Sequence, residues 1–150
     1  MKAVVQRVKS ARVEVNGVSV ASIGQGLLTL LGVVPSDDQN DVNWIIEKIG
    51  KLRIFEDDEK KMNKSLLDLK LQHLIVSQFT LCGDTKKGNR PSFTGAALPK
   101  DAAVWVDAAI EKSKALGIQT ESGVFGADMQ VVLQNDGPVT FILDSCEKTK

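Results

Sequence analysis

Apolar and polar residues alternate near the start of the chain, which is the period of a half-buried β-strand. Alternate valines flank an Asn16-Gly17 pair, namely Val13, Val15, Val18 and Val20. Asn-Gly is preferred in two-residue hairpin turns, because both central residues take positive φ there. The pattern therefore predicts a β-hairpin. The next run, Leu27 to Val34, is continuously apolar and predicts a buried central strand.

The apolar spacing then becomes helical in two places. One stripe runs from about Asp38 to Lys51 and is formed by Val42, Ile45, Ile46, Ile49 and Leu52. A second helix is predicted to begin near Pro99 and to stop at Gly117, because proline suits a first helical turn and glycine suits a helix end. Its sheet-facing side would carry Trp105, Val106, Ala109, Ser113 and Leu116.

Shorter segments complete the predicted elements. We expect a short strand at 53–55 followed by a charged turn at 56–61, then strands at about 73–81, 130–134 and 139–143. Residues 83–95 are rich in Gly, Lys and Pro and predict a long, functional loop. The order is not the strict strand–helix alternation of a doubly wound sheet. We predict a single α/β domain over residues 1–150, with a mixed, largely antiparallel sheet curled toward a barrel and two helices packed on it.

Composition restricts the class of protein more than the activity. The chain has 43% hydrophobic and 25% charged residues, which is ordinary for a globular domain. Its 19 basic and 19 acidic residues cancel, which argues against coating nucleic acid by bulk attraction but leaves room for a local basic patch. No apolar run approaches the roughly 18 residues needed to cross a bilayer, and no signal segment is visible, so a cytoplasmic location without membrane attachment is expected.

Metal and cofactor motifs are absent from the sequence. There is no CxxC, HExxH or His/Cys cluster for zinc, and no Walker sequence. Gly24-Gln25-Gly26 lacks a third glycine and a following helix, so it predicts only a turn. Two cysteines, Cys82 and Cys146, do not make a disulfide framework. We expect no metal and no cofactor.

The segment Ser77-Gln78-Phe79-Thr80-Leu81 places hydroxyl and amide groups at a predicted strand end, beside the loop. They either cap neighbouring backbone or form a pocket wall that binds a polar substrate. In an extended strand Gln78 and Thr80 would share one face. Thr80 is a weak nucleophile without a base, and His73 lies seven residues away on the opposite face, which is roughly 20 Å or more in a strand.

Two other segments have ordinary structural interpretations. Cys82 is expected to be a small apolar residue near a strand end, and not a reactive thiol. Asn135-Asp136-Gly137-Pro138 is expected to be a turn between two strands. Since only about 5–6% of X–Pro bonds in folded proteins are cis, the residues alone predict no cis bond.

Taken together, the motifs are more informative. The chain has Ser-Gln-Phe-Thr-Leu at 77–81, Gly-Asn-Arg-Pro-Ser-Phe at 88–93 and Asn-Asp-Gly-Pro-Val-Thr at 135–140. Their order and approximate spacing resemble the D-aminoacyl-tRNA deacylase family, and the opening Met-Lys-Ala-Val-Val-Gln-Arg-Val resembles that family's first strand. The resemblance covers essentially the whole chain.

The resemblance implies a homodimeric enzyme. It would hydrolyse the ester between a D-amino acid, or mischarged glycine, and the 3′-terminal adenosine of tRNA. Gly137 and Pro138 would form a Gly-cisPro element that enters the partner subunit's pocket and excludes L-amino acids. Ser77, Gln78, Phe79 and Thr80 would form the catalytic wall.

The resemblance leaves several roles open. Thr80 either attacks the ester or only positions it while the tRNA 2′-hydroxyl assists water, and the missing base favours the second. Phe125 and Met129 either enclose the terminal adenine or belong to the core. Lys86, Lys87 and Arg90 either meet acceptor-stem phosphates or are simply solvated. A non-catalytic RNA-end-binding dimer, or a hydrolase of other esters using Thr80 or Cys82, are the rival functions.

Overall fold

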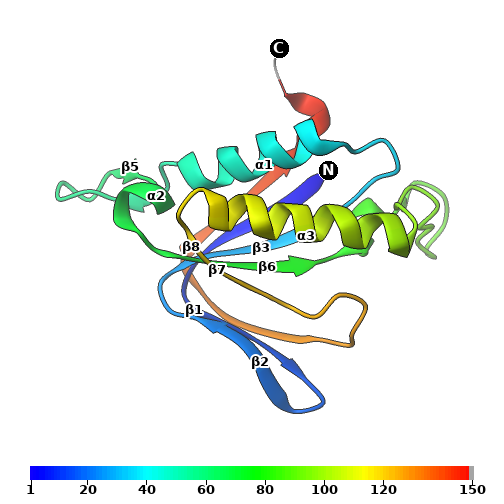
Figure 1. Ribbon diagram of the computed structural model, residues 1–150, viewed down its shortest axis with the longest axis horizontal. Coiled ribbons are helices and arrows are strands. Elements are labelled where there is room, and N and C mark those ends of the chain that lie inside the picture. Colours follow the sequence, from blue (N-terminus) through cyan, green and yellow to red (C-terminus); the bar gives the residue numbers. More distant parts are fainter. Residues whose placement is uncertain (149–150) are drawn as a thin grey trace.

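A mixed sheet forms the centre of the computed structural model, which describes residues 1–148 (Figure 1). The strand order is β2-β1-β3-β6-β7, with β8 on the other edge of β1. β1 is antiparallel to β2, β3 and β8, whereas β3–β6 and β6–β7 are parallel pairs. The strands are β1 (Lys2–Val15), β2 (Val18–Ile23), β3 (Gly26–Gly32), β6 (Gln72–Ser77), β7 (Gln119–Ser122) and β8 (Gln130–Asp144).

Two long helices cover one face of this sheet (Figure 1). α1 (Gln39–Lys51) begins at Asp38, whose carboxylate accepts hydrogen bonds from the backbone N–H groups of Asn40 and Asp41. α3 (Pro99–Ala115) has proline in its first turn. The fully buried side of α1 packs on the sheet and on α3 through Val42, Ile45, Ile46 and Ile49.

The strands bend back on themselves below the helices (Figure 1). β2 also contacts β6 and β7, so the sheet is nearly closed into a barrel. A second apolar cluster fills the inside of this curl and includes Val8, Val13, Leu28 and Leu74. The predicted fold class, a mixed sheet curled toward a barrel with helices packed on it, is confirmed. Residues 149 and 150 of the expected domain 1–150 lie outside the described residues.

The predicted hairpin, central strand and two long helices are all confirmed. Asn16 and Gly17 have φ values of 51° and 76° between β1 and β2. Leu27, Leu28 and Leu31 of β3 are buried between β1 and β6. Gly117 follows α3 with φ +82°.

The predicted strand at 53–55 is wrong. β4 (Phe55–Glu56) pairs with β5 (Met62–Lys64), and a short α2 (Leu66–Leu69) follows. The turn between β4 and β5 is held by Asp57, whose Oδ1 accepts hydrogen bonds from the backbone N–H groups of Glu59 and Lys61. A local side-chain contact of this kind leaves no periodic pattern in the sequence.

The predicted strand at 73–81 ends early, at Ser77. The last ladder bond runs from the Gln78 N–H to the Leu31 carbonyl at 2.8 Å, and a 3₁₀ helix, η1 (Phe79–Cys82), follows. Gly32 makes this possible, because a Cβ there would lie 3.0 Å from the Gln78 carbonyl oxygen and 3.1 Å from Cys82 Sγ. The predicted alternation of faces therefore fails beyond Ser77.

The two predicted closing strands are one long strand, β8. Asn135 to Pro138 do not form a turn between strands but an irregular stretch where the register against β1 shifts. The Gly137–Pro138 peptide bond is cis, and Gly137 has φ +121°. β7 was also not predicted, since its four residues are too few for a clear period. No helix in residues 1–148 is long and apolar enough to cross a membrane.

Candidate functional site

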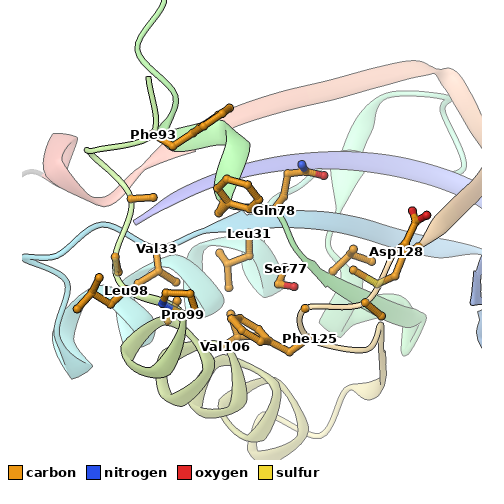
Figure 2. A pocket seen from close by; sticks show the side chains of 18 of the residues that line it. Leu31, Val33, Ser77, Gln78, Phe93, Leu98, Pro99, Val106, Phe125 and Asp128 are labelled. Atoms are coloured by element: carbon orange, nitrogen blue, oxygen red, sulfur yellow. The ribbon is translucent and has the colours of Figure 1, made fainter. Parts of the chain in front are cut away.

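A cavity of about 580 Å³ opens where β3 and β6 end, beside the start of α3 (Figure 2). Figure 2 shows Ser77 and Gln78 on one side, with Phe125 and Asp128 approaching from the segment before β8. Leu31, Val33 and Val106 form an apolar floor. The remaining lining comes from Val76, Phe79, Phe93, the 96–99 segment, Ala102, the 126–127 segment, Met129 and Val131.

Three of the four predicted catalytic-wall residues line this cavity: Ser77, Gln78 and Phe79. Thr80 does not line it, but its Oγ1 accepts a hydrogen bond from Gln78 Nε2. Among the described residues, the backbone N–H groups of Phe79 and Thr80 have no hydrogen-bond acceptor. The end of β6 thus offers hydroxyl, amide and free N–H groups to a bound molecule.

Among residues 1–148, no acidic or basic side chain is hydrogen-bonded to Thr80. His73 is fully buried, and its two ring nitrogens lie 2.8 Å from Thr29 Oγ1 and 2.9 Å from Ser113 Oγ. Desolvation by burial lowers the pKa of His73 to about 3, so the ring is neutral. The chain is not an extended strand from His73 to Thr80. His73 is still unavailable to Thr80, because both of its ring nitrogens are engaged by other residues.

Cys82 is a core residue, as expected. Its thiol is buried and lies 3.5 Å from the Val33 carbonyl oxygen. Desolvation by burial raises the pKa of Cys82, which keeps it protonated at neutral pH. A thiol in that state is a poor nucleophile.

Phe125 and Met129 line the same cavity as Ser77 and Gln78, and Figure 2 shows Phe125 approaching it from the segment before β8. The Phe125 ring is 40% exposed, so it is not an ordinary core side chain. Met129 is half-buried and packs on the barrel cluster, yet it also lines the cavity. Gly123 leaves room for it, since a Cβ there would lie 2.7 Å from Met129 Sδ. Asp128, which was not predicted, borders the same cavity.

Gly137 and Pro138 do not line the cavity of their own chain, and both are exposed. Their position is nevertheless fixed. Asn135 Nδ2 donates to the carbonyl oxygens of Arg7 at 2.9 Å and Val139 at 3.0 Å. A Cβ on Gly137 would lie 2.8 Å from Val139 Cγ2, and φ +121° also favours glycine.

Arg7 supports this segment and was missed in the sequence, where it is one residue of an alternating strand. It is buried, with Nε 3.1 Å from Asp136 Oδ2 and Nη1 donating to the Ile54 carbonyl at 2.6 Å. A buried guanidinium needs such partners. Its signal in the sequence is its position, because strand alternation puts Arg7 on the same face as Ala3 and Val5, which are both buried.

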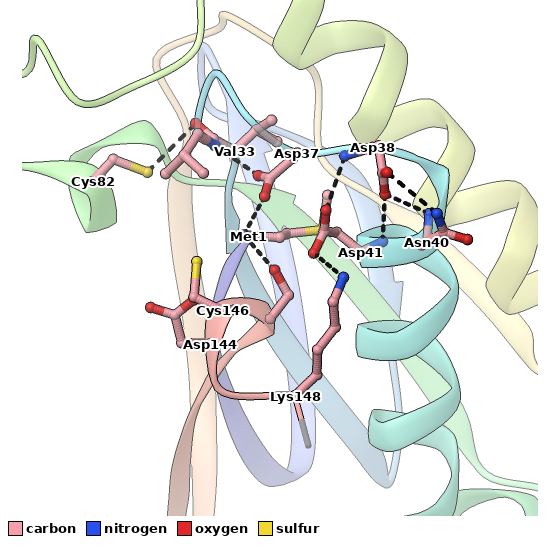
Figure 3. Close-up of polar contacts among 12 residues, drawn as sticks. Met1, Val33, Asp37, Asp38, Asn40, Asp41, Cys82, Asp144, Cys146 and Lys148 are labelled. Atoms are coloured by element: carbon pink, nitrogen blue, oxygen red, sulfur yellow. Dashed lines mark hydrogen bonds and ion pairs between the residues drawn. The ribbon is translucent and has the colours of Figure 1, made fainter. Parts of the chain in front are cut away.

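Another cluster of charged groups lies near the chain termini and does not touch the cavity (Figure 3). The Met1 ammonium bonds the Asp37 carboxylate and, at 2.7 Å, Ser145 Oγ. Lys148 Nζ donates to Asp41 Oδ1 at 2.8 Å. Burial raises the pKa of Asp41, but hydrogen bonds from Lys148 and the Asp38 backbone lower it by more, to below its usual value. These contacts join the start of α1 to both ends of the described chain and are structural.

No group of three or more metal-ligating side chains occurs within residues 1–148. The cavity wall instead combines neutral polar groups and the Asp128 side chain with an apolar floor. Such a surface binds and orients an organic ligand through shape and a few hydrogen bonds.

Comparisons with known proteins agree on one family. The family model described as D-Tyr-tRNA(Tyr) deacylase matches residues 4–144. A D-aminoacyl-tRNA deacylase from Desulfatibacillum aliphaticivorans is 56% identical over 145 residues, covering 97% of this chain and 99% of that protein. Another, from Thermomicrobium roseum, is 53% identical over 147 residues, covering 98% and 96%.

Two solved structures share the fold. The c-Myc DNA Unwinding Element Binding Protein aligns with a TM-score of 0.90 at 41% identity, covering 96% of this chain and 98% of that one. A probable eukaryotic D-amino acid tRNA deacylase aligns with a TM-score of 0.82 over 95% and 97%. The second is only 18% identical, so it bears on the fold alone.

Proposed function

The chain belongs to the D-Tyr-tRNA(Tyr) deacylase family, and from that premise we propose that it removes D-amino acids, and mischarged glycine, from the 3′-terminal adenosine of tRNA. It is an enzyme that hydrolyses aminoacyl-tRNA esters. The observation that carries the proposal is a cavity lined both by Ser77, Gln78 and Phe79 and by Phe125 and Met129. An adenosine ester has an aromatic base at one end and a polar ester at the other, which matches these two groups of residues.

In the proposed complex the adenine lies beside Phe125 and Met129. An aromatic ring and a flexible thioether both suit the flat face of a base. The ester then reaches Ser77 and Gln78, where the free N–H groups of Phe79 and Thr80 would stabilise the oxyanion that forms when water attacks. An aminoacyl ester is already reactive, so positioning and oxyanion stabilisation can account for much of the acceleration.

We further propose that the tRNA's own 2′-hydroxyl assists the attacking water. Thr80 is the alternative nucleophile, but its hydroxyl receives a hydrogen bond from Gln78 and, among the described residues, makes none to an acidic or basic side chain. His73 is neutral and fully engaged with Thr29 and Ser113. The 2′-hydroxyl is adjacent to the 3′-ester within the substrate itself, so it is close to the reacting carbonyl without positioning by the protein.

Chiral selectivity is assigned to Gly137 and Pro138 of a partner subunit. Both are exposed and rigidly supported, yet they lie outside their own chain's cavity, which supports their use in a second copy. Their backbone carbonyls would accept hydrogen bonds from the substrate ammonium, and an L-side chain would collide with that backbone. Glycine has no side chain to exclude, so cleavage of glycyl-tRNA follows.

A homodimer is therefore part of the proposal. β8 pairs with β1 alone among the described strands, so its other edge is open along 15 residues. Exposed open edges are normally covered. β8 also exposes Val132, Phe141 and Ile142, the last at 79%. This apolar edge supports an interface with a second copy of the chain.

Two organisational expectations remain proposals. We propose that residues 1–150 act as one domain, since β1, β3 and β6 contribute to both apolar clusters. We also propose a cytoplasmic location, because that is where tRNA is aminoacylated.

The proposed function predicts hydrolysis that depends on the nucleoside. Purified protein would be given D-tyrosyl-tRNA and, separately, D-tyrosine ethyl ester, and release of free D-tyrosine would be followed. The tRNA ester should be hydrolysed at least about a hundredfold faster, because only it reaches the adenine side of the cavity. Binding without hydrolysis would indicate the RNA-end-binding alternative, and equal rates would indicate a general esterase.

A further inference from the structure

Two phenylalanine rings form an exposed pair at the rim of the cavity. Phe79 is 57% exposed and Phe93 is 39% exposed. Their ring centroids are 5.1 Å apart and the ring planes are inclined by 67°. Large apolar side chains exposed together beside a cavity are typical of a binding surface. The catalytic wall proposed above uses the Phe79 backbone and leaves both rings unexplained.

The backbone around Phe93 is fixed although it belongs to a long loop. Asp84 and Ser92 exchange two backbone hydrogen bonds of 2.7 and 2.9 Å, and the Phe93 carbonyl accepts one from Ala96 at 3.0 Å. Gly83 allows the ring to approach η1, since a Cβ there would lie 3.0 Å from Phe93 Cε1. The ring is thus held before any ligand arrives, which lowers the entropic cost of binding.

The geometry of the pair leaves aromatic surface free. Because one ring turns its edge to the face of the other, at least one ring keeps both faces clear of its partner. A flat aromatic face binds nucleobases by stacking, with little dependence on which base is present.

Positive charge lies on the loop that joins the two rings. Lys86, Lys87 and Arg90 are exposed, and none of them takes part in the ion pairs formed by residues 1–148. Unpaired cations beside an aromatic platform are the usual combination at sites for single-stranded nucleic acid. A tRNA acceptor end is single-stranded over its last nucleotides.

We propose that the Phe79–Phe93 pair stacks on the base of the nucleotide that precedes the terminal adenosine, a cytidine in tRNA, while the loop cations bind its phosphate. The inference rests on the proposed function, because it requires the terminal adenosine to occupy the side of the cavity formed by Phe125 and Met129. Phe79 and Phe93 line the same cavity as Phe125 and Met129, so the ring pair adjoins the space that the adenosine would occupy.

The test compares two small substrates, the 3′-D-tyrosyl ester of adenosine and that of the dinucleotide cytidylyl-adenosine. The wild-type chain should hydrolyse the dinucleotide ester with a kcat/KM about fivefold or more above that of the adenosine ester. Phe93→Leu should remove most of this advantage through KM. Phe93→Tyr, which keeps the ring, should retain it.

Stacking can also be measured directly. A dinucleotide with pyrrolocytosine in place of cytosine and a D-tyrosyl amide in place of the ester should lose fluorescence on binding the wild-type chain and Phe93→Tyr. Phe93→Leu should bind it with less quenching.

The outcomes separate this inference from the proposed function. If wild-type protein hydrolyses both esters equally well, or if Phe93→Leu lowers both rates by the same factor, the second-base site is wrong while the deacylase activity stands. If neither ester is hydrolysed although the protein is folded, the proposed activity fails and the inference fails with it.

Discussion

Thr80 has a hydroxyl group beside the cavity wall but, among the described residues, no acidic or basic side chain hydrogen-bonded to it. Gln78 Nε2 donates to Thr80 Oγ1, and His73 is occupied by Thr29 and Ser113. A hydroxyl that receives a hydrogen bond and cannot lose its proton is a weak nucleophile. At this position the side chain is better suited to hold Gln78 in place.

Thr80→Ala tests this role. We expect kcat on D-tyrosyl-tRNA to fall by roughly tenfold or less, because only the support of Gln78 is lost. Removing a true nucleophile costs several orders of magnitude. Single-turnover rates would distinguish the two, and a loss on that larger scale would show that Thr80 forms the covalent intermediate.

The companion measurement changes the substrate. A D-tyrosyl-tRNA with a 2′-deoxy terminal adenosine should react about a hundredfold or more slowly if the 2′-hydroxyl assists the water. Undiminished hydrolysis of the deoxy substrate would contradict substrate assistance, whatever the Thr80 result.

The backbone conformation at position 137 and the close approach of Val139 both favour glycine there. Gly137→Ala places a Cβ 2.8 Å from Val139 Cγ2 at φ +121°, so the exposed segment must shift. We expect the ratio of D- to L-tyrosyl-tRNA hydrolysis to fall by about tenfold or more, with little change in the thermal unfolding midpoint of the dimer. Gly88→Ala, at a positive-φ glycine with open space around it, is the matched control for backbone strain. An unchanged ratio in Gly137→Ala would remove this segment from the selectivity mechanism.

His73 predicts a pH dependence of stability. Its pKa is lowered from 6.5 to about 3 in the folded chain, so the unfolded chain binds the extra proton first. The stability of the folded chain relative to the unfolded chain is unaffected by this histidine above pH 6.5. It decreases as the pH falls from 6.5 toward 3, because the unfolded chain is protonated first. The free energy of unfolding should decrease by up to about 1.4 kcal/mol per pH unit below pH 6.5. Urea unfolding between pH 7.5 and 5 would measure this slope, which should be smaller in His73→Gln; an equal slope would contradict a neutral buried imidazole.

At the scale of elements, the periodicity of apolar residues predicted the type and approximate position of the long elements. The hairpin at Asn16-Gly17, the buried strand from Gly26 and both long helices follow from patterns repeated over many residues. The family resemblance implied that Ser77 to Thr80 form a site wall, and three of these residues line the cavity, but the geometry of the segment was not predicted. Whether the chain continues as a strand after Ser77 depends on the space that Gly32 leaves for Gln78, a residue far away in the sequence.

Sequence patterns also failed to predict the structure of the Asn135 to Pro138 segment in β8. Asn-Asp-Gly-Pro has every local feature of a turn, yet contacts from Asn135 and Arg7 hold it inside a continuous strand. The composition of a tetrapeptide does not reveal a partner 128 residues away. The cavity likewise joins segments near 31, 77, 98 and 125 that no sequence pattern connects.

The open edge of β8 gives a prediction at this scale. Ile142→Asp puts a charge on the most exposed apolar side chain of the strand, and the proposed dimer should dissociate. Val18→Asp, at an exposed valine of the β1–β2 hairpin, is the matched control and should stay dimeric. Sedimentation velocity would show the change, together with loss of activity in the monomer. A variant that remains dimeric, or a monomer with full activity, would contradict the shared site.

At the scale of the whole molecule, the hydrophobic core and the proposed functional segments lie in different parts of the fold. The helix-covered face of the sheet carries most of the core, whereas the cavity lies where β3 and β6 end and the Gly137 segment lies in the middle of β8. In the proposed mechanism neither is a complete site in one chain. The account therefore depends on two copies, each of which supplies a cavity for the other's selectivity segment.

The measurement that tests this account most directly is the rate of ester loss from one tRNA charged in turn with D-tyrosine, glycine and L-tyrosine. The account predicts rapid hydrolysis of the D-tyrosyl and glycyl esters and a rate for the L-tyrosyl ester lower by about a hundredfold or more. Equal rates for the D- and L-tyrosyl esters would contradict it.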